Sequence, residues 1–229
     1  MRLSIIIPCY NEAEHIAQVI KAVSDVDLHG IEKEIIIVDD GSTDDTIRVI
    51  NEHNADKRIT LHISNENVGK GAAIRAGLNY VTGDIVIIQD ADLEYDPEQY
   101  LEIITPIVEG NADVVYGSRF LGKIEGMRIQ NRLANYILTF TTNLLFGMHI
   151  TDEATCYKAF KSDVLKQMPL KCCGFEFCPE VTAKLAKHHI DIYEVPIHYT
   201  GRNKKEGKKI RLSDAFVAVW TLFKYRFVN

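Results

Sequence analysis

Residues 85–97 read IVIIQDADLEYDP, and this stretch decides how the rest of the chain is interpreted. Its first residues are apolar without helical spacing and lie between Gly83 and Pro97, which predicts a short strand buried on both faces. Carboxylates follow at once: Asp90, Asp92, Glu94 and Asp96. Open α/β sheets bind ligands at the carboxyl ends of strands, and a divalent cation shared with phosphate oxygens relieves repulsion between clustered carboxylates. The alternative interpretation is an acidic turn in solvent.

Strand and helix patterns alternate on both sides of this stretch. Buried strands are expected at residues 3–7, 35–38, 59–63, 85–88 and 114–116. Amphipathic helices lie between them, the first capped by Asn11 and the second starting at Ser42 or Thr43. This alternation through residues 1–118 predicts an α/β fold with a doubly wound, mainly parallel sheet.

The pattern changes after Phe120. Gly122 and Gly126 are expected to frame a loop. Beyond them we expect an apolar helix at residues 130–147, a second helix at 177–188 and a strand at 192–196. A basic loop at 201–209 and a final amphipathic helix at 212–227 are expected to follow.

Composition places the chain among soluble globular proteins. Its 229 residues suffice for one compact domain, and the net charge of −6 argues against a nucleic-acid partner. The five cysteines show no metal-ligand spacing. The N-terminus starts directly into a strand pattern without a signal peptide, and no apolar run reaches the ~18–20 residues that span a bilayer. We therefore expect a cytoplasmic protein that is still able to touch a membrane surface.

Three predicted strands end in polar residues, PCYNE at 8–12, DDGS at 39–42 and the acidic stretch. Parallel strands bring such ends to one edge of the sheet, which is the arrangement expected of a nucleotide site. No GxGxxG follows the first strand, which argues against a dinucleotide cofactor.

Four ordered motifs resemble those of inverting family-2 glycosyltransferases of the GT-A fold: PCYNE at 8–12, VDDGSTDDT at 38–46, NVGKGAAIRAG at 67–77 and QDADL at 89–93. Later motifs are similar to the dolichyl-phosphate mannose synthase branch: GSR at 117–119, TD at 151–152, FEF at 175–177 and EVPIHYTGRNKKEGKK at 194–209. The chain departs from that branch in carrying TCYK at 155–158 and Gly207 where other members have an SGFR-like segment and serine.

The resemblance implies a role for each matching residue. The base and ribose would be held by Pro8, Tyr10, Glu12, Val38 and Asp40. Asp90 and Asp92, with the backbone of Ala91, would engage the diphosphate and a Mg²⁺ or Mn²⁺ ion. Glu94 stands where the family often has a glutamine that is a third metal ligand. The phosphates of donor and acceptor would be gripped by Arg119, Arg202 and Lys208.

Three further assignments stay open. Lys70 lies between two glycines and is either a diphosphate contact or a surface residue. Either Glu176 or Glu180, after the FEF motif, is a candidate to face the site. A lipid phosphate is already ionised near neutral pH and needs cations, whereas a sugar hydroxyl needs a carboxylate base. With a sugar hydroxyl as acceptor, Asp152 is the candidate base; with a lipid phosphate, it orients the basic groups. The expected catalytic residues are Asp92, Arg119, Asp152 and Arg202.

Two helices are suited to a membrane interface. The helix at 130–147 has Arg128 and Arg132 near its start, and the final helix carries Phe216, Trp220 and Phe227 beside basic residues. Alternatively, both helices pack on the sheet or form a dimer contact. We expect peripheral contact with the cytoplasmic face of the membrane, with a homodimer or a separate membrane-anchor subunit as further options.

These expectations define one overall hypothesis. Residues 1–211 form a GT-A domain, with a nucleotide-sugar half at 1–118 and an acceptor half at 119–211, followed by an amphipathic helix at 212–229. A metal-dependent enzyme of this kind would move a hexose, mannose or glucose, from a GDP- or UDP-sugar to dolichyl or undecaprenyl phosphate. The rivals are a transferase that acts on a saccharide hydroxyl in surface polysaccharide assembly, and a non-catalytic sugar-nucleotide-binding module.

Overall fold

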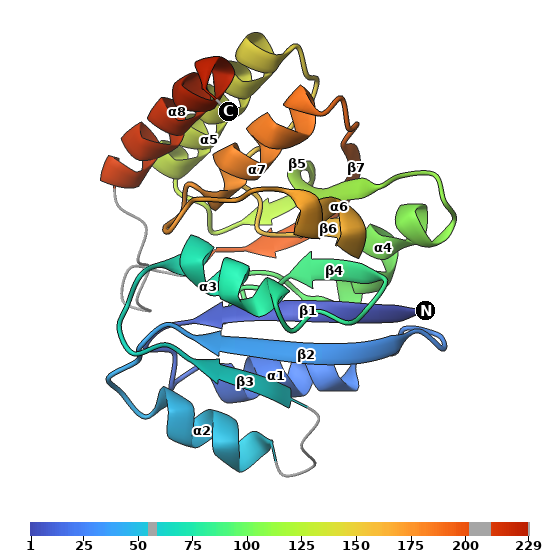
Figure 1. The fold of residues 1–229 in the computed structure, drawn as a ribbon, viewed down its shortest axis with the longest axis vertical. Helices are drawn as coiled ribbons and strands as arrows, with labels where there is room; N and C mark the ends of the chain where they lie inside the picture. The colour runs from blue at the N-terminus through green and yellow to red at the C-terminus, as the bar shows by residue number, and fades with distance from the viewer. Residues whose placement is uncertain (55–58, 202–211, 229) are drawn as a thin grey trace.

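One twisted sheet organises the molecule. The computed structural model describes residues 1–54, 59–201 and 212–228. Within them, a seven-stranded sheet has the order β3-β2-β1-β4-β6-β5-β7 (Figure 1). The strands are β1 (Arg2–Cys9), β2 (Glu32–Asp39), β3 (Ile59–Ile63), β4 (Ile85–Ile88), β5 (Val114–Glu125), β6 (Lys158–Lys161) and β7 (Tyr193–Thr200).

The strands are parallel except for β6, which runs antiparallel to both of its neighbours, β4 and β5. The mainly parallel α/β sheet expected from the sequence is therefore confirmed. At its centre, Ile5 pairs with Ile35 on one side and Ile87 on the other. Ile5 and Ile87 are fully buried, and covering each such side chain stabilises the fold by roughly 1.5–3 kcal/mol.

Helices cover both faces of the sheet. They are α1 (Ile16–Asp25), α2 (Thr46–His53), α3 (Lys70–Leu78), the 3₁₀ turn η1 (Pro97–Gln99), α4 (Tyr100–Val108), α5 (Ile129–Phe146), α6 (Ser162–Gln167), α7 (Phe177–Lys187) and α8 (Leu212–Phe227). Figure 1 shows α5, α7 and α8 side by side at the end of the molecule opposite α2, and α8 contacts both of the others. The expected long helices at 130–147 and 212–227 are thus present. Among the described helices, none is both long and apolar enough to cross a bilayer.

The predicted caps of the first two helices are wrong. The first helix begins at Ile16, and Asn11 lies in the left-handed region with φ of 49°. The Asn11 side-chain oxygen accepts a hydrogen bond from the Thr43 N–H at 2.8 Å, so it joins two loops instead of closing a helix turn. The second helix begins at Thr46, after the segment that carries Ser42 and Thr43.

The predicted loop between Gly122 and Gly126 is also wrong, because β5 continues to Glu125 beside β7. The pairing shifts register between Ser118 and Lys123, which conceals the strand pattern. A Cβ at Gly122 would lie 2.0 Å from the Ile197 carbonyl oxygen, so glycine here permits close approach of two strands. Strand β6 and helix α6 were not expected from the sequence.

Candidate active site

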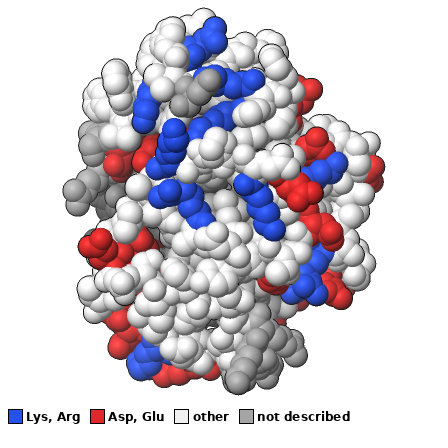
Figure 2. Space-filling view, in the orientation of Figure 1, with Lys and Arg blue, Asp and Glu red and all other residues white. Residues whose placement is uncertain are grey.

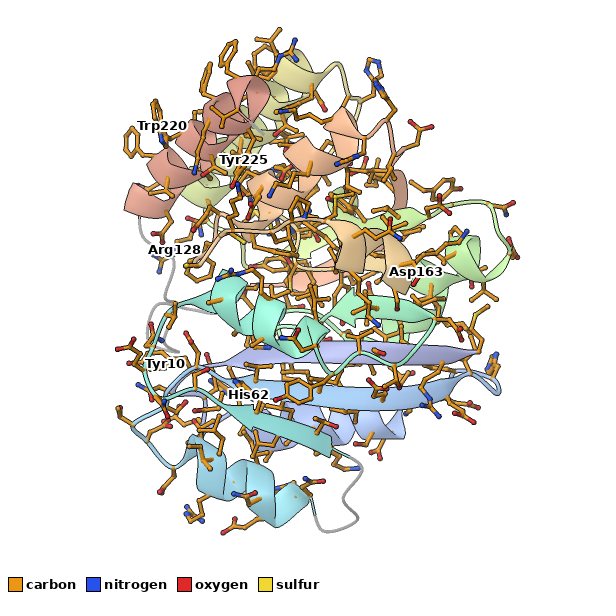
Figure 3. The ribbon with its side chains drawn as sticks, viewed as in Figure 1. Tyr10, His62, Arg128, Asp163, Trp220 and Tyr225 are labelled. Atoms are coloured by element: carbon orange, nitrogen blue, oxygen red, sulfur yellow. The ribbon has the colours of Figure 1, made fainter. Side chains whose placement is uncertain are left out.

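The carboxyl ends of β1, β2 and β4 meet at one edge of the sheet. Pro8 pairs with Val38 and Cys9 with Asp39, and the Asp40 N–H donates to the Cys9 carbonyl at 2.8 Å. Figure 3 shows Tyr10 at this edge, with Arg128 above it on the same side of the molecule. The three polar motifs therefore converge as the sequence predicted.

The residues assigned to the base and ribose differ in how accessible they are. Pro8 is buried, Tyr10 is half-buried and Glu12 is 8% exposed. The Val38 side chain is fully buried in the core, so a ligand could reach only its backbone. Asp40 accepts hydrogen bonds from the Val68 and Gly69 N–H groups at 3.1 and 2.7 Å. Asp40 thus holds the glycine loop that leads into α3, and its role toward a nucleotide stays a prediction.

Lys70 lies inside the site. It is the first residue of α3, and its ammonium forms an ion pair with Asp90 while its Nζ lies 3.5 Å from the Cys156 Sγ. Burial opposes the charge, but the Asp90 carboxylate and the neighbouring thiols raise the pKa of Lys70 well above its ordinary value. A positive charge is therefore fixed beside the first carboxylate of the acidic motif.

A buried glutamine anchors the acidic motif to the core. The Tyr100 and Tyr157 hydroxyls donate to the Gln89 side-chain oxygen at 2.7 and 2.8 Å, and the Gln89 amide donates to the Asp90 carbonyl at 2.9 Å. Gln89, Tyr100 and Tyr157 are fully buried. This network fixes the end of β4 and leaves the Asp90 side chain at the edge of the sheet.

Glu94 is engaged by the C-terminal half of the chain. Its carboxylate accepts a hydrogen bond from the Tyr199 hydroxyl at 2.6 Å, and its carbonyl accepts from the Thr200 N–H at 3.1 Å. The Asp92 carboxylate accepts from the Glu94 N–H at 3.1 Å. Among the described residues, no three His, Cys, Asp or Glu side chains form a metal-binding group. Metal ligation by Glu94 stays a prediction.

Asp90 and Asp92 fit a Mg²⁺ or Mn²⁺ ion that is shared with a diphosphate. Such ions are usually held by one or two carboxylates together with substrate phosphates and water, so a cage of protein ligands is not needed. The Lys70 ammonium on Asp90 shows that this position attracts a cation. The donor set is therefore suitable, with hard oxygen ligands at the mouth of the site.

Arg119 and Asp152 form a buried, bidentate ion pair. The Arg119 Nε and Nη2 donate to the two Asp152 carboxylate oxygens at 2.6 and 2.7 Å, and the Arg119 backbone N–H donates at 3.0 Å. Asp152 is fully buried and Arg119 is 6% exposed. Glu194 accepts from the Thr151 and Asp152 N–H groups and fixes this turn. The geometry makes Asp152 the residue that orients the guanidinium.

The remaining site predictions concern two basic residues and two glutamates. Arg202 and Lys208 lie outside the described residues. Glu176 accepts hydrogen bonds from Cys173 and Gly174, and Glu180 accepts them from Lys171 and Cys172. Both carboxylates are thus engaged by the segment 171–174, which packs against the start of α3.

Sequence reasoning did not assign roles to Gln89 or Tyr199. A signal was present, because Gln89 directly precedes the acidic motif and Tyr199 lies two residues before the basic loop. The Arg119 guanidinium lies 5.2 Å from the centre of the Tyr199 ring, so this tyrosine contacts both the acidic motif and the arginine.

The chain belongs to glycosyl transferase family 2, whose family model matches residues 4–168. This confirms the resemblance drawn from the motifs. The edge of the sheet with its acidic motif is the candidate active site of this family member.

Curated relatives cover nearly the whole chain. The chain is 31% identical to an undecaprenyl-phosphate 4-deoxy-4-formamido-L-arabinose transferase of Edwardsiella ictaluri over 90% of its length and 62% of the relative's. It is 30% identical to a UDP-N-acetylglucosamine–dolichyl-phosphate N-acetylglucosaminyltransferase of Methanococcus voltae, over 91% of its length and 90% of the relative's. It is 28% identical to a dolichol-phosphate mannosyltransferase of Pyrococcus furiosus, over 92% of its length and 61% of the relative's. The chain thus spans less than two thirds of the first and third of these proteins.

A solved structure supports the fold. Glucosyl-3-phosphoglycerate synthase of Mycobacterium tuberculosis, crystallised with UDP, superposes with a TM-score of 0.77 at 19% identity, covering 100% of this chain and 81% of that one. The same enzyme has been crystallised with Mn²⁺ and with Mg²⁺. At this identity the likeness establishes the GT-A fold alone.

Proposed function

We propose that the protein transfers a hexose from a GDP- or UDP-sugar to a polyprenyl phosphate, with inversion at the anomeric carbon and with a divalent cation at Asp90 and Asp92. The proposal is supported by the names of the three relatives, which act on undecaprenyl, dolichyl or dolichol phosphate. The motif resemblance favours mannose, and the relatives' names include other sugars, so GDP-mannose and UDP-glucose are the donors to test first.

The observation that carries the proposal is the state of Asp152. Both of its carboxylate oxygens accept hydrogen bonds from Arg119, and the residue is fully buried. A general base has to reach the proton that it removes, and this carboxylate is held away from solvent by a permanent cation. An acceptor that is already ionised does not require such a base. The geometry therefore favours a phosphate acceptor over a saccharide hydroxyl.

Transfer to an ionised phosphate then depends on positive charges beside the donor and acceptor phosphates more than on proton transfer. A phosphate oxygen of the acceptor attacks the anomeric carbon, the bond from that carbon to the donor diphosphate breaks, and the nucleoside diphosphate leaves with the electron pair. A divalent cation at Asp90 and Asp92, when bound, neutralises charge on the leaving diphosphate. Lys70 adds a second positive charge beside Asp90. Arg119 is held by Asp152 for contact with a phosphate, and Arg202 and Lys208 are proposed to assist it.

We further propose that α5 and α8 lie at the cytoplasmic face of the membrane. Large apolar side chains on these helices are exposed to solvent, including Ile129, Phe140, Leu144, Phe216, Trp220 and Phe227 at 67–85%. Figure 3 shows Trp220 on the same side of the molecule as Tyr10 and the site. Figure 2 shows Lys and Arg side chains gathered over the α3, α7 and α8 part of this view, with acidic side chains toward its margins. Apolar helices beside basic residues suit an anionic lipid surface.

A transfer assay tests the proposed function. The protein, Mn²⁺ and radiolabelled GDP-mannose or UDP-glucose are incubated with undecaprenyl or dolichyl phosphate, and the expected product is radiolabelled lipid that extracts into chloroform. Asp92→Ala should abolish both transfer and metal-dependent donor binding. Absence of lipid product with every common GDP- and UDP-sugar would rule out the polyprenyl acceptor. Transfer to a saccharide would then support the first rival, and donor binding without turnover the second.

Vesicle sedimentation tests the membrane contact. Wild-type protein should sediment with vesicles that contain anionic lipid, and replacement of Phe216 and Trp220 by serine should reduce the bound fraction several-fold. Sedimentation equilibrium without lipid examines the alternatives: a stable dimer that the same double substitution dissociates would identify this surface as a contact between copies. A surface that binds neither lipid nor a second copy would point to a separate anchor subunit.

A further inference from the structure

We infer that Glu180 is a positioning residue that ties helix α8 to the α3 wall of the proposed diphosphate site. The effect on donor binding rests on the proposed function, whereas the connection between α8 and α3 is a property of the fold. It links the helix assigned to the membrane surface with the lysine that faces the acidic motif.

Four donors from three parts of the chain converge on the Glu180 carboxylate. The Lys171 and Cys172 N–H groups donate at 2.8 and 2.7 Å, the Lys184 Nζ at 2.5 Å, and the Tyr225 hydroxyl of α8 at 2.6 Å. Glu180 is fully buried. Burial acts against its charge, but these hydrogen bonds lower the pKa of Glu180 to about 2. A single ionised carboxylate thus joins α7, α8 and the segment 171–174.

The segment 171–174 is in turn bonded to the start of α3. The Gly174 carbonyl accepts from the Gly71 N–H at 3.1 Å, and the Cys173 carbonyl accepts from the Ala72 N–H at 2.9 Å. These two N–H groups belong to the first turn of the helix, where no intrahelical partner exists. The segment therefore serves as the N-terminal cap of α3.

The contact between this segment and α3 leaves little room for independent movement. A Cβ at Gly69 would lie 2.5 Å from the Cys173 carbonyl oxygen, and one at Gly71 would lie 2.8 Å from the Cys172 Sγ. Both glycines flank Lys70 in the sequence. A shift of the segment must therefore shift the backbone that carries Lys70.

Lys70 completes the connection, because its ammonium is paired with Asp90. Removal of the Tyr225 hydroxyl takes one hydrogen bond from Glu180, and replacement of Glu180 removes the charge that holds residues 171 and 172. In both cases the start of α3 loses rigidity, and with it the placement of Lys70 beside the diphosphate. By linkage, any state of α8 that favours the Tyr225–Glu180 bond also favours donor binding.

The test compares Tyr225→Phe and Glu180→Gln with matched controls. Tyr193→Phe alters an exposed tyrosine of β7, and Glu102→Gln alters an exposed carboxylate of α4. Amide hydrogen exchange of the peptide 66–78 reports whether the cap of α3 has loosened. Calorimetric titration with UDP and GDP in the presence of Mn²⁺, well below the unfolding midpoint, reports donor affinity.

We expect faster exchange in the first turn of α3 in both variants and in neither control. Nucleotide binding should weaken about threefold in Tyr225→Phe and about tenfold in Glu180→Gln, with the donor KM rising and kcat changing little. A lower unfolding temperature with unchanged exchange at 66–78, or faster exchange with unchanged nucleotide affinity, would overturn the positioning role. If the wild type binds neither nucleotide, the proposed function fails, and the exchange measurement decides separately whether Glu180 ties α8 to α3.

Discussion

Replacement of Asp152 by asparagine separates the two possible acceptors most directly. Asp152 receives three N–H groups of Arg119, two from the guanidinium and one from the backbone, in a fully buried position. Asparagine offers one oxygen and turns an NH₂ group toward the guanidinium, which leaves a buried cation without its counter-charge. Breaking a buried pair in this way costs about 3–5 kcal/mol. For a chain of this size, that corresponds to a fall in Tm of roughly 10 °C.

The activity of the same variant follows from the role of Arg119. Donor affinity, measured by titration with UDP or GDP and Mn²⁺, should stay within about twofold of the wild type, since Asp90 and Asp92 are untouched. The KM for the polyprenyl phosphate should rise at least about tenfold, because the arginine that we propose binds the acceptor phosphate loses its orientation. Asp163→Asn is the matched control, since Asp163 is an exposed residue of α6 on the other side of the view in Figure 3. A folded Asp152→Asn protein with normal donor binding, unchanged acceptor KM and almost no turnover would refute this reasoning and identify Asp152 as a base.

Three further predictions concern other parts of the fold. Burial raises the pKa of Glu153 to about 8 from an ordinary 4.5, so folding favours its protonated form; the stabilisation is complete below about pH 4.5 and is lost as the pH rises through 8. Glu153→Gln should flatten this dependence and raise the free energy of unfolding at pH 8 by up to roughly 4 kcal/mol in urea titrations; an unchanged pH profile would contradict it. Tyr199→Phe removes the hydrogen bond to Glu94 and should lower kcat several-fold with about 1 kcal/mol lost in stability, whereas unchanged kinetics would mean that this bond does not position the acidic motif. Gly122→Ala places a Cβ 2.0 Å from the Ile197 carbonyl oxygen and should cost at least about 2 kcal/mol in thermal denaturation; a neutral effect would mean that β5 and β7 can separate there.

The sequence was most informative where structure is local. Short apolar runs bounded by glycine and proline placed β1, β2 and β4 correctly, because a strand buried on both faces requires such a run. The polar residues at the carboxyl ends of these strands could be placed at one edge of the sheet for the same reason. The cap at Asn11 failed because its side chain bonds a residue 32 positions away, and a local capping rule does not include such competition.

Long-range pairing explains the other failures. Nothing local in the residues of β6 indicates that they insert between β4 and β5. The orientation of Arg119 depends on a partner 33 positions away, and the bond of Glu180 to Tyr225 spans 45 positions. The motif resemblance made Asp152 a candidate, either as a base or as an orienting residue, and the geometry of its pair with Arg119 is what favours the second role. The division at residue 118 stays a prediction.

The position of β6 has a consequence for how the protein is made. On the ribosome, β1 to β4 emerge first and can assemble as a parallel sheet, since each of them has a neighbour within this group of four strands. Strand β5 emerges next but has no direct partner in that sheet, because β6 must occupy the place beside β4. The nascent chain therefore carries an unpaired, apolar β5 and the exposed helix α5 until about residue 161 has left the exit tunnel. During that interval a chaperone or the membrane surface itself would have the longest access to the chain.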